Sequence, residues 1–579
     1  MCFNSIYLTP TNSTEISQII DDLKVKATAD INVTSIKTAN NSTPKFSETI
    51  ADIINRSLIE GVFPSLLKTA KVVPVHKGGS KISIENYRPI SLLSAISKIY
   101  EKVMYTRVYD FLSQNNILIE NQFGFRKGRS CEQSLLTAQN EILTSLSKKQ
   151  ISLLILIDFS KAFDMVDHDL LLEKLHRYGI RGIAHEWFKS YLKGRTQYVT
   201  INGKNSSTLD MLHGVPQGSI LGPLLFIIYI NDIPNINKEC TFILYADGAN
   251  ILISGQTIAE IEEKFNSLAK NLEIWVNTNG LALNLKKTNY MVFSNSRIHN
   301  LPFKPRICNF EIERKFSCRF LGVIINETLT WNEHIRAIKA KMSRYVGILY
   351  KLKTYLPLSA RKNIFHSFVQ SHLSYCSLVW GLGPKASLEQ LFSEQKKAMR
   401  ALMPGYNINY YKDGIKPCHT KPFFTKYEIL TVHSIILTNI LIFMHKCNEF
   451  KHLTPLSVSR IISPDALKHG QVNEKTIAWM ASHTTEKLRD AISFKGPLFY
   501  SKYMPEILEK NGLKYPCNVP VNLFKKHTKS FIFEIQICDR PNEWEGTNTP
   551  LYNVPGLPRA NRENIPTVSY GEKYFDEEF

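Results

Sequence analysis

The stretches ISLLILIDFS (151–160) and TFILYADGANILIS (241–254) decide the fold. The first is a nearly continuous apolar run, rich in β-branched residues and ending at Asp158, which predicts a buried strand. In the second, two apolar runs flank Ala246-Asp247-Gly248, and an Asp-Gly pair in that setting predicts a β-hairpin. If the hairpin lies beside the strand in one sheet, Asp158 and Asp247 meet at the same edge.

Two carboxylates at one sheet edge repel each other unless cations neutralise them. Mg²⁺ prefers oxygen ligands and leaves room for substrate phosphates. Two such ions would activate an attacking hydroxyl and stabilise a leaving pyrophosphate. Taken alone, the pair is more simply explained as a strand-end cap, Asp158, and an ordinary turn residue, Asp247. The assignment therefore depends on the surrounding motifs.

The composition favours a polyanionic partner. Lys and Arg number 71 against 51 Asp and Glu, a formal charge of +20, which favours nucleic acid first and an anionic membrane surface second. The ten cysteines form no CxxC pair, which argues against a zinc site and for free thiols in a reducing compartment. With no apolar run long enough to span a bilayer and no secretory leader, we expect an intracellular protein, in the nucleus, the cytoplasm or both.

Helical periodicity follows Trp331, where apolar residues repeat every three or four positions at 335, 338, 342, 345, 348 and 352. No Asp or Glu occurs between Glu333 and Glu389, although Lys and Arg recur through that stretch. Helices with one sign of charge suit a phosphate backbone, and the alternative is a solvated basic face. The first turns of this region contribute Arg336, Lys339 and Arg344 as candidate nucleic-acid contacts.

Eight motifs occur in one order along the chain. The motifs are LKTAKVVPVHKGGS (67–80), ENYRPISLL (85–93), NQFGFRKGRSC (121–131), LIDFSKAFDMVDH (156–168), GVPQGSILGPLLF (214–226), YADG (245–248), NGLALNLKKT (279–288) and FLGVIINETLTW (320–331). Together they resemble the reverse transcriptases of non-LTR retrotransposons, most closely the jockey-like group.

The resemblance implies an α+β right-hand polymerase, with fingers, a palm built on an antiparallel sheet, a helical thumb and a mostly helical C-terminal region. The expected organisation is a poorly ordered segment (1–45), fingers and palm (46–326), thumb (327–415), C-terminal connection region (416–535) and flexible tail (536–579). The implied partners are an RNA template, a DNA primer and a dNTP, with no membrane. The sequence gives no indication of an oligomeric state.

The resemblance also implies roles for individual residues. Asp158 and Asp247 match the carboxylates that hold two Mg²⁺ ions, and Lys287 matches a lysine proposed to protonate the leaving pyrophosphate. Phe163 matches the aromatic gate that excludes a ribose 2′-hydroxyl. Three further sets are implied: Gln217 and Gly218 against the nucleotide and template, Lys77 and Arg88 on the triphosphate, and Arg126, Lys127 and Arg129 on template phosphates.

One position departs from the family pattern, which is Tyr-Ala-Asp-Asp where this chain has Tyr245-Ala246-Asp247-Gly248. Glycine cannot bind a metal through a side chain, although it suits a hairpin tip with positive φ. We therefore expect the fold to survive and catalysis to be impaired, with the second metal site in doubt. An endonuclease domain is also not found, so we expect the product to need help in nicking a target. The alternatives are a non-catalytic nucleic-acid-binding remnant and the product of an inactive gene.

Overall fold

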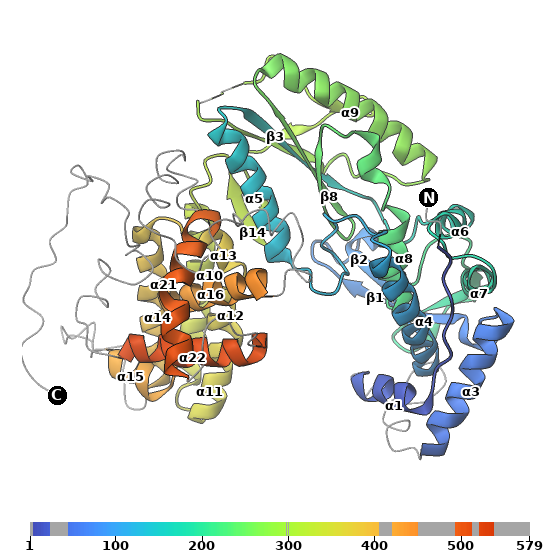
Figure 1. The fold of residues 1–579 in the computed structure, drawn as a ribbon, viewed down its shortest axis with the longest axis horizontal. Helices are drawn as coiled ribbons and strands as arrows, with labels where there is room; N and C mark the ends of the chain where they lie inside the picture. The colour runs from blue at the N-terminus through green and yellow to red at the C-terminus, as the bar shows by residue number, and fades with distance from the viewer. Residues whose placement is uncertain are drawn as a thin grey trace, which may run out of the picture. The chain divides into compact units, whose positions relative to one another are not determined.

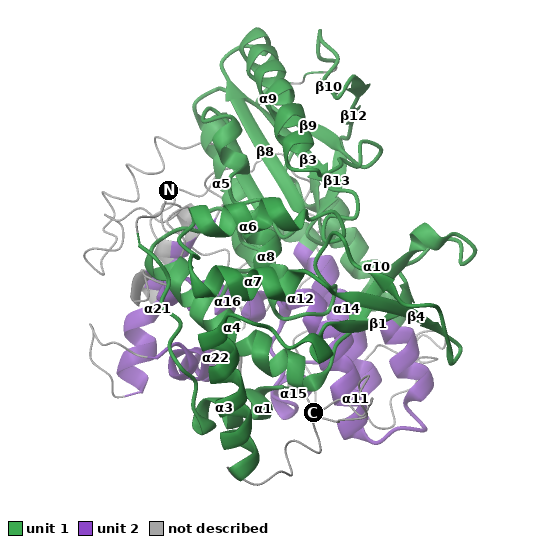
Figure 2. Cartoon of the chain, turned by 90° about the vertical axis from the view of Figure 1, so that its right-hand side faces the viewer, with its two compact units in different colours: residues 1–344, 375–387, 450–461 green, residues 345–374, 388–449, 462–579 purple. Residues whose placement is uncertain are grey.

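The computed structural model describes residues 4–23, 44–296, 298, 300–403, 420–449, 492–511 and 520–537 (Figure 1). The chain divides into two compact units (Figure 2). The first comprises residues 1–344, 375–387 and 450–461, and the second comprises residues 345–374, 388–449 and 462–579. Most of the flexible tail expected at 536–579 lies outside the described residues.

The centre of the first unit is a five-stranded sheet with the order β12-β9-β3-β8-β7. Strand β3 pairs antiparallel with β8 and β9, β7 with β8 antiparallel, and β12 with β9 parallel. The predicted strand and hairpin are therefore confirmed. The strands are β3 (Ile151–Asp158), β7 (Thr241–Tyr245), β8 (Gly248–Gly255), β9 (Asn289–Phe293) and β12 (Glu313–Arg314).

Helices cover this sheet on both faces. Helix α9 (Ile258–Thr278) and the side chains of Leu153 and Ile155 belong to one core cluster. Helix α5 (Cys131–Ser147) packs against β3 and β7 (Figure 1), and neither its buried residues nor Leu154 of β3 belong to that cluster. Because successive residues of a strand point to opposite faces, the run 152–155 is buried throughout. The faces of the sheet are therefore packed in the protein interior, whereas Asp158 at the end of β3 is only partly buried.

A second sheet has the order β2-β1-β4-β5, and β6 also pairs with β4. Its strands are β1 (Thr69–His76), β2 (Tyr87–Leu92), β4 (Thr196–Ile201), β5 (Lys204–Asn205) and β6 (Leu209–Asp210). Short 3₁₀ turns lie at Ser65–Leu67 and Ile84–Asn86. Four α-helices and one 3₁₀ turn complete this part of the unit. The helices are α4 (Ala95–Gln114), α6 (His168–Arg177), α7 (Ile183–Leu192) and α8 (Leu221–Tyr229), and the turn is η3 (Ile233–Ile236).

The N-terminal segment is more ordered than its polar composition predicted. Residues Ser13–Asp22 form α1, capped by the Asn12 side chain and packed on α3 (Pro44–Glu60). Ile16, Ile19 and Ile20 are buried in the main core. The expectation of a poorly ordered segment is therefore wrong for residues 13–22, because a short i, i+3, i+4 apolar set is enough to dock a helix. Residues 24–43 lie outside the described residues.

Two hairpins and a long helix end the first unit. The hairpins are β10 (Arg306–Ile307) with β11 (Phe310–Glu311), and β13 (Ser317–Phe320) with β14 (Val323–Asn326). Helix α10 (Asn332–Leu352) follows, and the short α13 (Ser377–Trp380) returns to pack on α5. The predicted helix is confirmed, although its buried stripe continues through Val346 and Leu349 rather than Ile348, which is exposed.

The second unit is helical throughout its described residues. Helix α16 packs on α21 and α22, with α12 also in contact. Besides the end of α10, its helices are α11 (Leu358–Phe365), a π-helical turn η4 (His366–Gln370), α12 (Ser371–Ser374), α14 (Lys385–Leu402), α15 (Lys421–Lys426), α16 (Val432–Glu449), α21 (Ile492–Lys510) and α22 (Val521–Ile537). None of the helices in the described part of the chain combines the length and apolar character needed to cross a bilayer.

Candidate active site

The structure brings Asp158 and Asp247 together at one sheet edge. Asp158 ends β3 and lies opposite Gly248 in the β3–β8 register, and Asp247 precedes Gly248 in the turn between β7 and β8. Burial raises the pKa of the Asp247 carboxyl, and the negative charge of Asp158 raises it further. The positive charges of Arg88 and Lys287 oppose that rise. The site is thus a carboxylate pair with cations around it.

Gly248 does not occupy the strained turn position that the sequence suggested. The positive φ of 55° falls on Ala246, and Gly248 is the first residue of β8. The expectation that glycine suits this position through a positive φ is therefore wrong. A Cβ built at Gly248 meets only the Tyr245 carbonyl oxygen, at 3.4 Å, an ordinary van der Waals contact. Nothing in the backbone therefore requires glycine at this position.

Residues 121–124 hold the hairpin in place, a contact that the sequence pattern did not predict. Backbone hydrogen bonds of 2.8 and 2.9 Å join Leu244 to residues 121–123. The buried Gln122 side-chain oxygen accepts from the amides of Gly124 at 2.9 Å and Ala246 at 3.2 Å. A Cβ at Gly124 would lie 2.2 Å from the Ala246 nitrogen. Gln122 and Gly124 are visible in the sequence motif 121–131, but only the fold shows what they contact.

Residues 284–287 approach Asp158 from the chain that follows α9. The Lys287 Nζ lies 3.3 Å from the Asp158 Oδ2. Asn284, which the sequence analysis missed, donates its backbone N–H to the Asp158 carbonyl at 2.8 Å and its side-chain amide to Oδ2 at 3.4 Å. Lys287 is largely exposed, so its ammonium is accessible to a ligand at the carboxylates.

The PQGS loop lies against the second sheet. The Gln217 carbonyl accepts from the Ser91 N–H at 2.8 Å, and the Gln217 side-chain amide donates to Asp164 at 2.8 Å. Gly218 has φ +140°, and a Cβ there would lie 2.3 Å from the Ser91 carbonyl oxygen. Glycine at 218 therefore permits a close approach of this loop to β2, and the role of Gln217 and Gly218 toward a nucleotide and template stays a prediction.

Phe163 is half-buried between two other aromatic rings. Its ring stacks on Phe226 with centroids 4.8 Å apart and meets Phe125 edge-on at 6.1 Å. Lys77 follows β1 and Arg88 lies in β2 opposite Val75, and both cations are exposed. The positive charge of Arg88 acts to lower the pKa of the Asp247 carboxyl, so it is within electrostatic reach of that group.

The cluster at 126–129 contains two kinds of cation. Lys127 is exposed, whereas Arg126 and Arg129 are half-buried. Arg126 donates to the Ile119 carbonyl at 2.6 Å, and Arg129 lies over the Phe123 ring. Burial, followed by the charge of Arg126, lowers the pKa of Arg129 to about 10. Both arginines thus also support the segment that holds the hairpin.

The candidate thumb residues lie on α10. Arg336 and Arg344 are exposed, and Lys339 is partly exposed on the same helix. The opposite side of this helix, through Ile335, Ile338 and Met342, is buried. The three cations therefore occupy the solvent side of an amphipathic helix.

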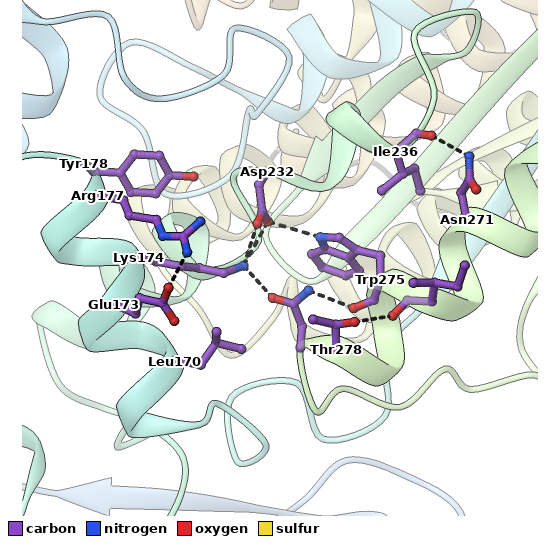
Figure 3. Close-up of a pocket in the computed structure, with 12 residues that line it drawn as sticks. Leu170, Glu173, Lys174, Arg177, Tyr178, Asp232, Ile236, Asn271, Trp275 and Thr278 are labelled. Carbon is purple, nitrogen blue, oxygen red and sulfur yellow. Dashed lines mark hydrogen bonds and ion pairs between the residues drawn. The ribbon is translucent and has the colours of Figure 1, made fainter. Parts of the chain in front are cut away.

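A cavity of about 660 Å³ lies apart from the carboxylates, between α6, η3 and α9 (Figure 3). The buried Lys174 ammonium at its wall donates to Asp232 at 2.9 Å, Asn279 at 2.5 Å and the Tyr229 carbonyl at 2.6 Å. The Trp275 indole also donates to Asp232, at 3.2 Å. Because these groups satisfy one another, this network fastens α6 to the ends of α8 and α9 and to the start of η3.

Comparison with known proteins places residues 75–325 in a family. This segment matches the family model "Reverse transcriptase (RNA-dependent DNA polymerase)". The chain is 28% identical over 415 residues to "Probable RNA-directed DNA polymerase from transposon BS" of Drosophila melanogaster, covering 69% of this chain and 45% of that protein. It is 26% identical over 413 residues to "RNA-directed DNA polymerase from mobile element jockey" of the same species, covering 69% and 44%.

The chain therefore spans less than half the length of these curated relatives. A telomerase structure from Candida albicans, in complex with a fragment of telomeric RNA, superposes with a TM-score of 0.36 and 12% identity, covering 61% of this chain and 65% of that one. Residues 75–325 thus match a reverse transcriptase domain, and the chain is similar to proteins named as RNA-directed DNA polymerases of the mobile elements BS and jockey.

Proposed function

We propose that this chain is an RNA-directed DNA polymerase whose catalysis is impaired by Gly248. In this proposal the sheet and the segments around Asp158 form the palm, β1 and β2 belong to the fingers, and α10 begins the thumb. The single observation that carries the proposal is the meeting of Asp158 and Asp247 at one sheet edge, with Lys287 and Arg88 beside them.

The donor set fits a divalent cation. Carboxylates are the ligands that Mg²⁺ takes from proteins, with water and substrate phosphates completing its shell. Among the described residues no group of three or more His, Cys, Asp or Glu side chains is positioned to hold a metal ion. A bound Mg²⁺ would supply charge stabilisation for the attacking hydroxyl and the leaving pyrophosphate. Two carboxylates suffice for one ion with substrate, and the glycine at 248 weakens the case for two.

The remaining residues act on the substrates. Lys77 and Arg88 bind the triphosphate oxygens, and Lys287 gives a proton to the leaving pyrophosphate. Phe163 is held by Phe125 and Phe226, so its ring is fixed where it excludes a 2′-hydroxyl. Gln217 and Gly218 lie against the nucleotide and template.

The nucleic-acid contacts divide between two places. Lys127, with the partly exposed edges of Arg126 and Arg129, contacts template phosphates beside the hairpin. Arg336, Lys339 and Arg344 line the solvent side of α10 and contact the backbone of the primer–template duplex. Such contacts make affinity fall steeply as salt concentration rises.

Primer extension tests the proposal. A DNA primer on an RNA template is offered with dNTPs and Mg²⁺ to the chain as it stands, to Gly248→Asp and to Gly248→Asp/Asp158→Asn. We expect feeble extension by the unaltered chain, at least about a hundredfold more by Gly248→Asp, and none by the double variant. The factor of a hundred follows because losing a metal-stabilised interaction worth several kcal/mol slows the rate by about that much. Strong extension by the unaltered chain, or none by Gly248→Asp, contradicts the proposal.

The alternative is a non-catalytic nucleic-acid-binding protein, which the glycine at 248 favours. It predicts tight, salt-sensitive binding of an RNA–DNA hybrid by the unaltered chain, with no extension by any variant.

A further inference from the structure

The segment from Gln217 to Ile220, which includes Gly218, is held by hydrogen bonds at both of its ends. At one end, Ser91 of β2 donates its N–H to the Gln217 carbonyl. At the other, the Glu101 side chain of α4 accepts hydrogen bonds where α8 begins. We propose that Glu101 is a positioning residue for nucleotide binding, acting through the backbone of this loop. The inference deepens the proposed polymerase function and rests on it.

Glu101 acts as the cap of α8 from a distant part of the chain. Its Oε2 accepts from the Ile220 N–H at 2.6 Å, and the Leu221 N–H also bonds to the carboxyl. The first amides of a helix have no partner within it, and a carboxylate there is favoured by the helix dipole. Ile220, which occupies the N-cap position, has no side chain that could do this. The contact spans 119 residues, so tertiary structure alone creates it.

The carboxyl group is fully buried in a polar cluster of its own. Glu101 Oε1 accepts from the Tyr191 hydroxyl at 3.2 Å and from Ser97 Oγ at 3.4 Å. Arg195, which is also fully buried, donates to the Tyr191 carbonyl at 3.2 Å, and its charge favours the ionised carboxyl. Burial raises the pKa of Glu101, and the helix amides and Arg195 oppose that rise.

Burying an ionisable group is unfavourable, and a well-packed apolar side chain would stabilise the junction of α4, α7 and α8 at least as well. A carboxyl group does what an apolar side chain cannot, which is to fix two backbone amides. The fixed amides lie three and four residues after Gln217. The segment between Gln217 and Ile220 is too short to absorb a shift, because the Ser91 carbonyl leaves no room for even a Cβ at Gly218 and the Ser219 hydroxyl donates to the Pro216 carbonyl at 2.9 Å. Displacing Ile220 therefore displaces Gln217.

The test compares Glu101→Ala, which removes both acceptor oxygens, with Glu101→Gln, which keeps one, each in the full-length Gly248→Asp chain. The matched control is Asp232→Asn, which makes the same carboxylate-to-amide change beside the buried cation Lys174, away from the loop. Two quantities are measured: hydrogen exchange of the peptide containing residues 216–222, and the KM and kcat for dNTP on a primer–template.

We expect faster exchange at Ile220 and Leu221 and a KM for dNTP raised about tenfold in Glu101→Ala, with a smaller change in kcat and intermediate values in Glu101→Gln. Asp232→Asn should leave both quantities at the parent values. If Glu101→Ala does not fold, Glu101→Gln decides alone, with faster exchange and a raised KM expected. Unchanged exchange and KM in the folded variants overturn the inference. An equal rise of KM in Asp232→Asn overturns it too, because the effect would then be a general loss of stability.

Failure of the polymerase proposal is recognised separately. If the Gly248→Asp parent extends no primer, the proposed function fails, while the exchange measurement still decides whether Glu101 holds the amides of residues 220 and 221.

Discussion

Restoring a carboxylate at Gly248 should make the stability of the protein depend on Mg²⁺. Position 248 lies directly opposite Asp158, and facing Cβ atoms in an antiparallel pair are about 5 Å apart. Two carboxylates at that separation repel by about 1 kcal/mol in water and about 3 kcal/mol at the effective dielectric constant of a protein surface. Asp158 is more than a third exposed, so the lower figure applies better. Without metal, Gly248→Asp should therefore be destabilised by about 1 kcal/mol.

Mg²⁺ should reverse this loss. A cation that binds only the folded state stabilises it by about 2.7 kcal/mol at a concentration 100 times its Kd. At about 2 °C per kcal/mol for a large domain, this raises the unfolding temperature by about 5 °C. The third ligand should lower the Kd, so the variant reaches that gain at a Mg²⁺ concentration where the unaltered chain responds little. Steric conflict is not expected, because a Cβ at 248 meets one atom at ordinary contact distance.

The assay is thermal unfolding of the two proteins in EDTA and across a Mg²⁺ titration, with Gly248→Asp/Asp158→Asn as the control. The double variant should lose the added response because Asp158 is one of the ligands. Equal Mg²⁺ responses in Gly248→Asp and the unaltered chain would refute the reasoning, since position 248 would then contribute nothing to a metal site. A large destabilisation in EDTA that Mg²⁺ does not relieve would refute it as well.

Three other substitutions test separate parts of the site. Asp247→Asn should stabilise the metal-free protein at neutral pH. The pKa of Asp247 is raised in the folded state, so ionisation of this carboxyl opposes folding as the pH rises above the ordinary value of 3.8. The stability gained by the variant should therefore vanish when denaturation is measured below that pH. An advantage that persists at low pH would show another cause. Gly124→Ala should destabilise the protein by about 1–3 kcal/mol in chemical denaturation, because the added Cβ overlaps the Ala246 nitrogen. The control is Gly347→Ala on α10, where an added Cβ meets nothing within 4 Å. Equal effects of the two would contradict this. Phe163→Ala in Gly248→Asp should raise the ratio of rNTP to dNTP incorporation at least tenfold in primer extension, since the ring excludes a 2′-hydroxyl. Both nucleotides are measured on one preparation, so any loss of folded protein affects them equally. An unchanged ratio would show that Phe163 does not exclude the 2′-hydroxyl.

Local patterns predicted the parts of the fold whose signal lies within one segment. The apolar run 151–157 and the pair of runs around 246–248 specify a buried strand and a hairpin, and both form. Helix α1 was missed because its apolar set is only three residues long, although Asn12 followed by Glu15 is a recognisable capping sequence. The positive φ was expected two residues too late, since Ala246, and not Gly248, adopts the left-handed conformation.

Contacts between distant segments could not be predicted in this way. The motif residues Asp158, Asp247 and Lys287 were found because the resemblance named them. By contrast, Gln122 accepts from the Ala246 backbone N–H, and Asn284 donates to the carbonyl and carboxylate of Asp158, each across more than 120 positions. Glu101 looks like any charged residue of an amphipathic helix until the fold buries it. Side chains whose function is to hold another segment carry no signature in their own neighbourhood.

The effect of a glycine at 248 depends on which contacts build the hairpin. Gln122, the backbone of residues 121–123 and the close approach of Gly124 all act on Leu244 and Ala246, and the pairing of β8 with β3 continues through backbone pairs to Gly255. None of these contacts uses a side chain at 248. The chain can therefore lose a carboxylate there with its sheet intact, because the residues that position the hairpin and the residue that would complete a metal site are different ones. Under this division of roles, a substitution at 248 should change metal response and rate, whereas one at Gly124 should change the fold first.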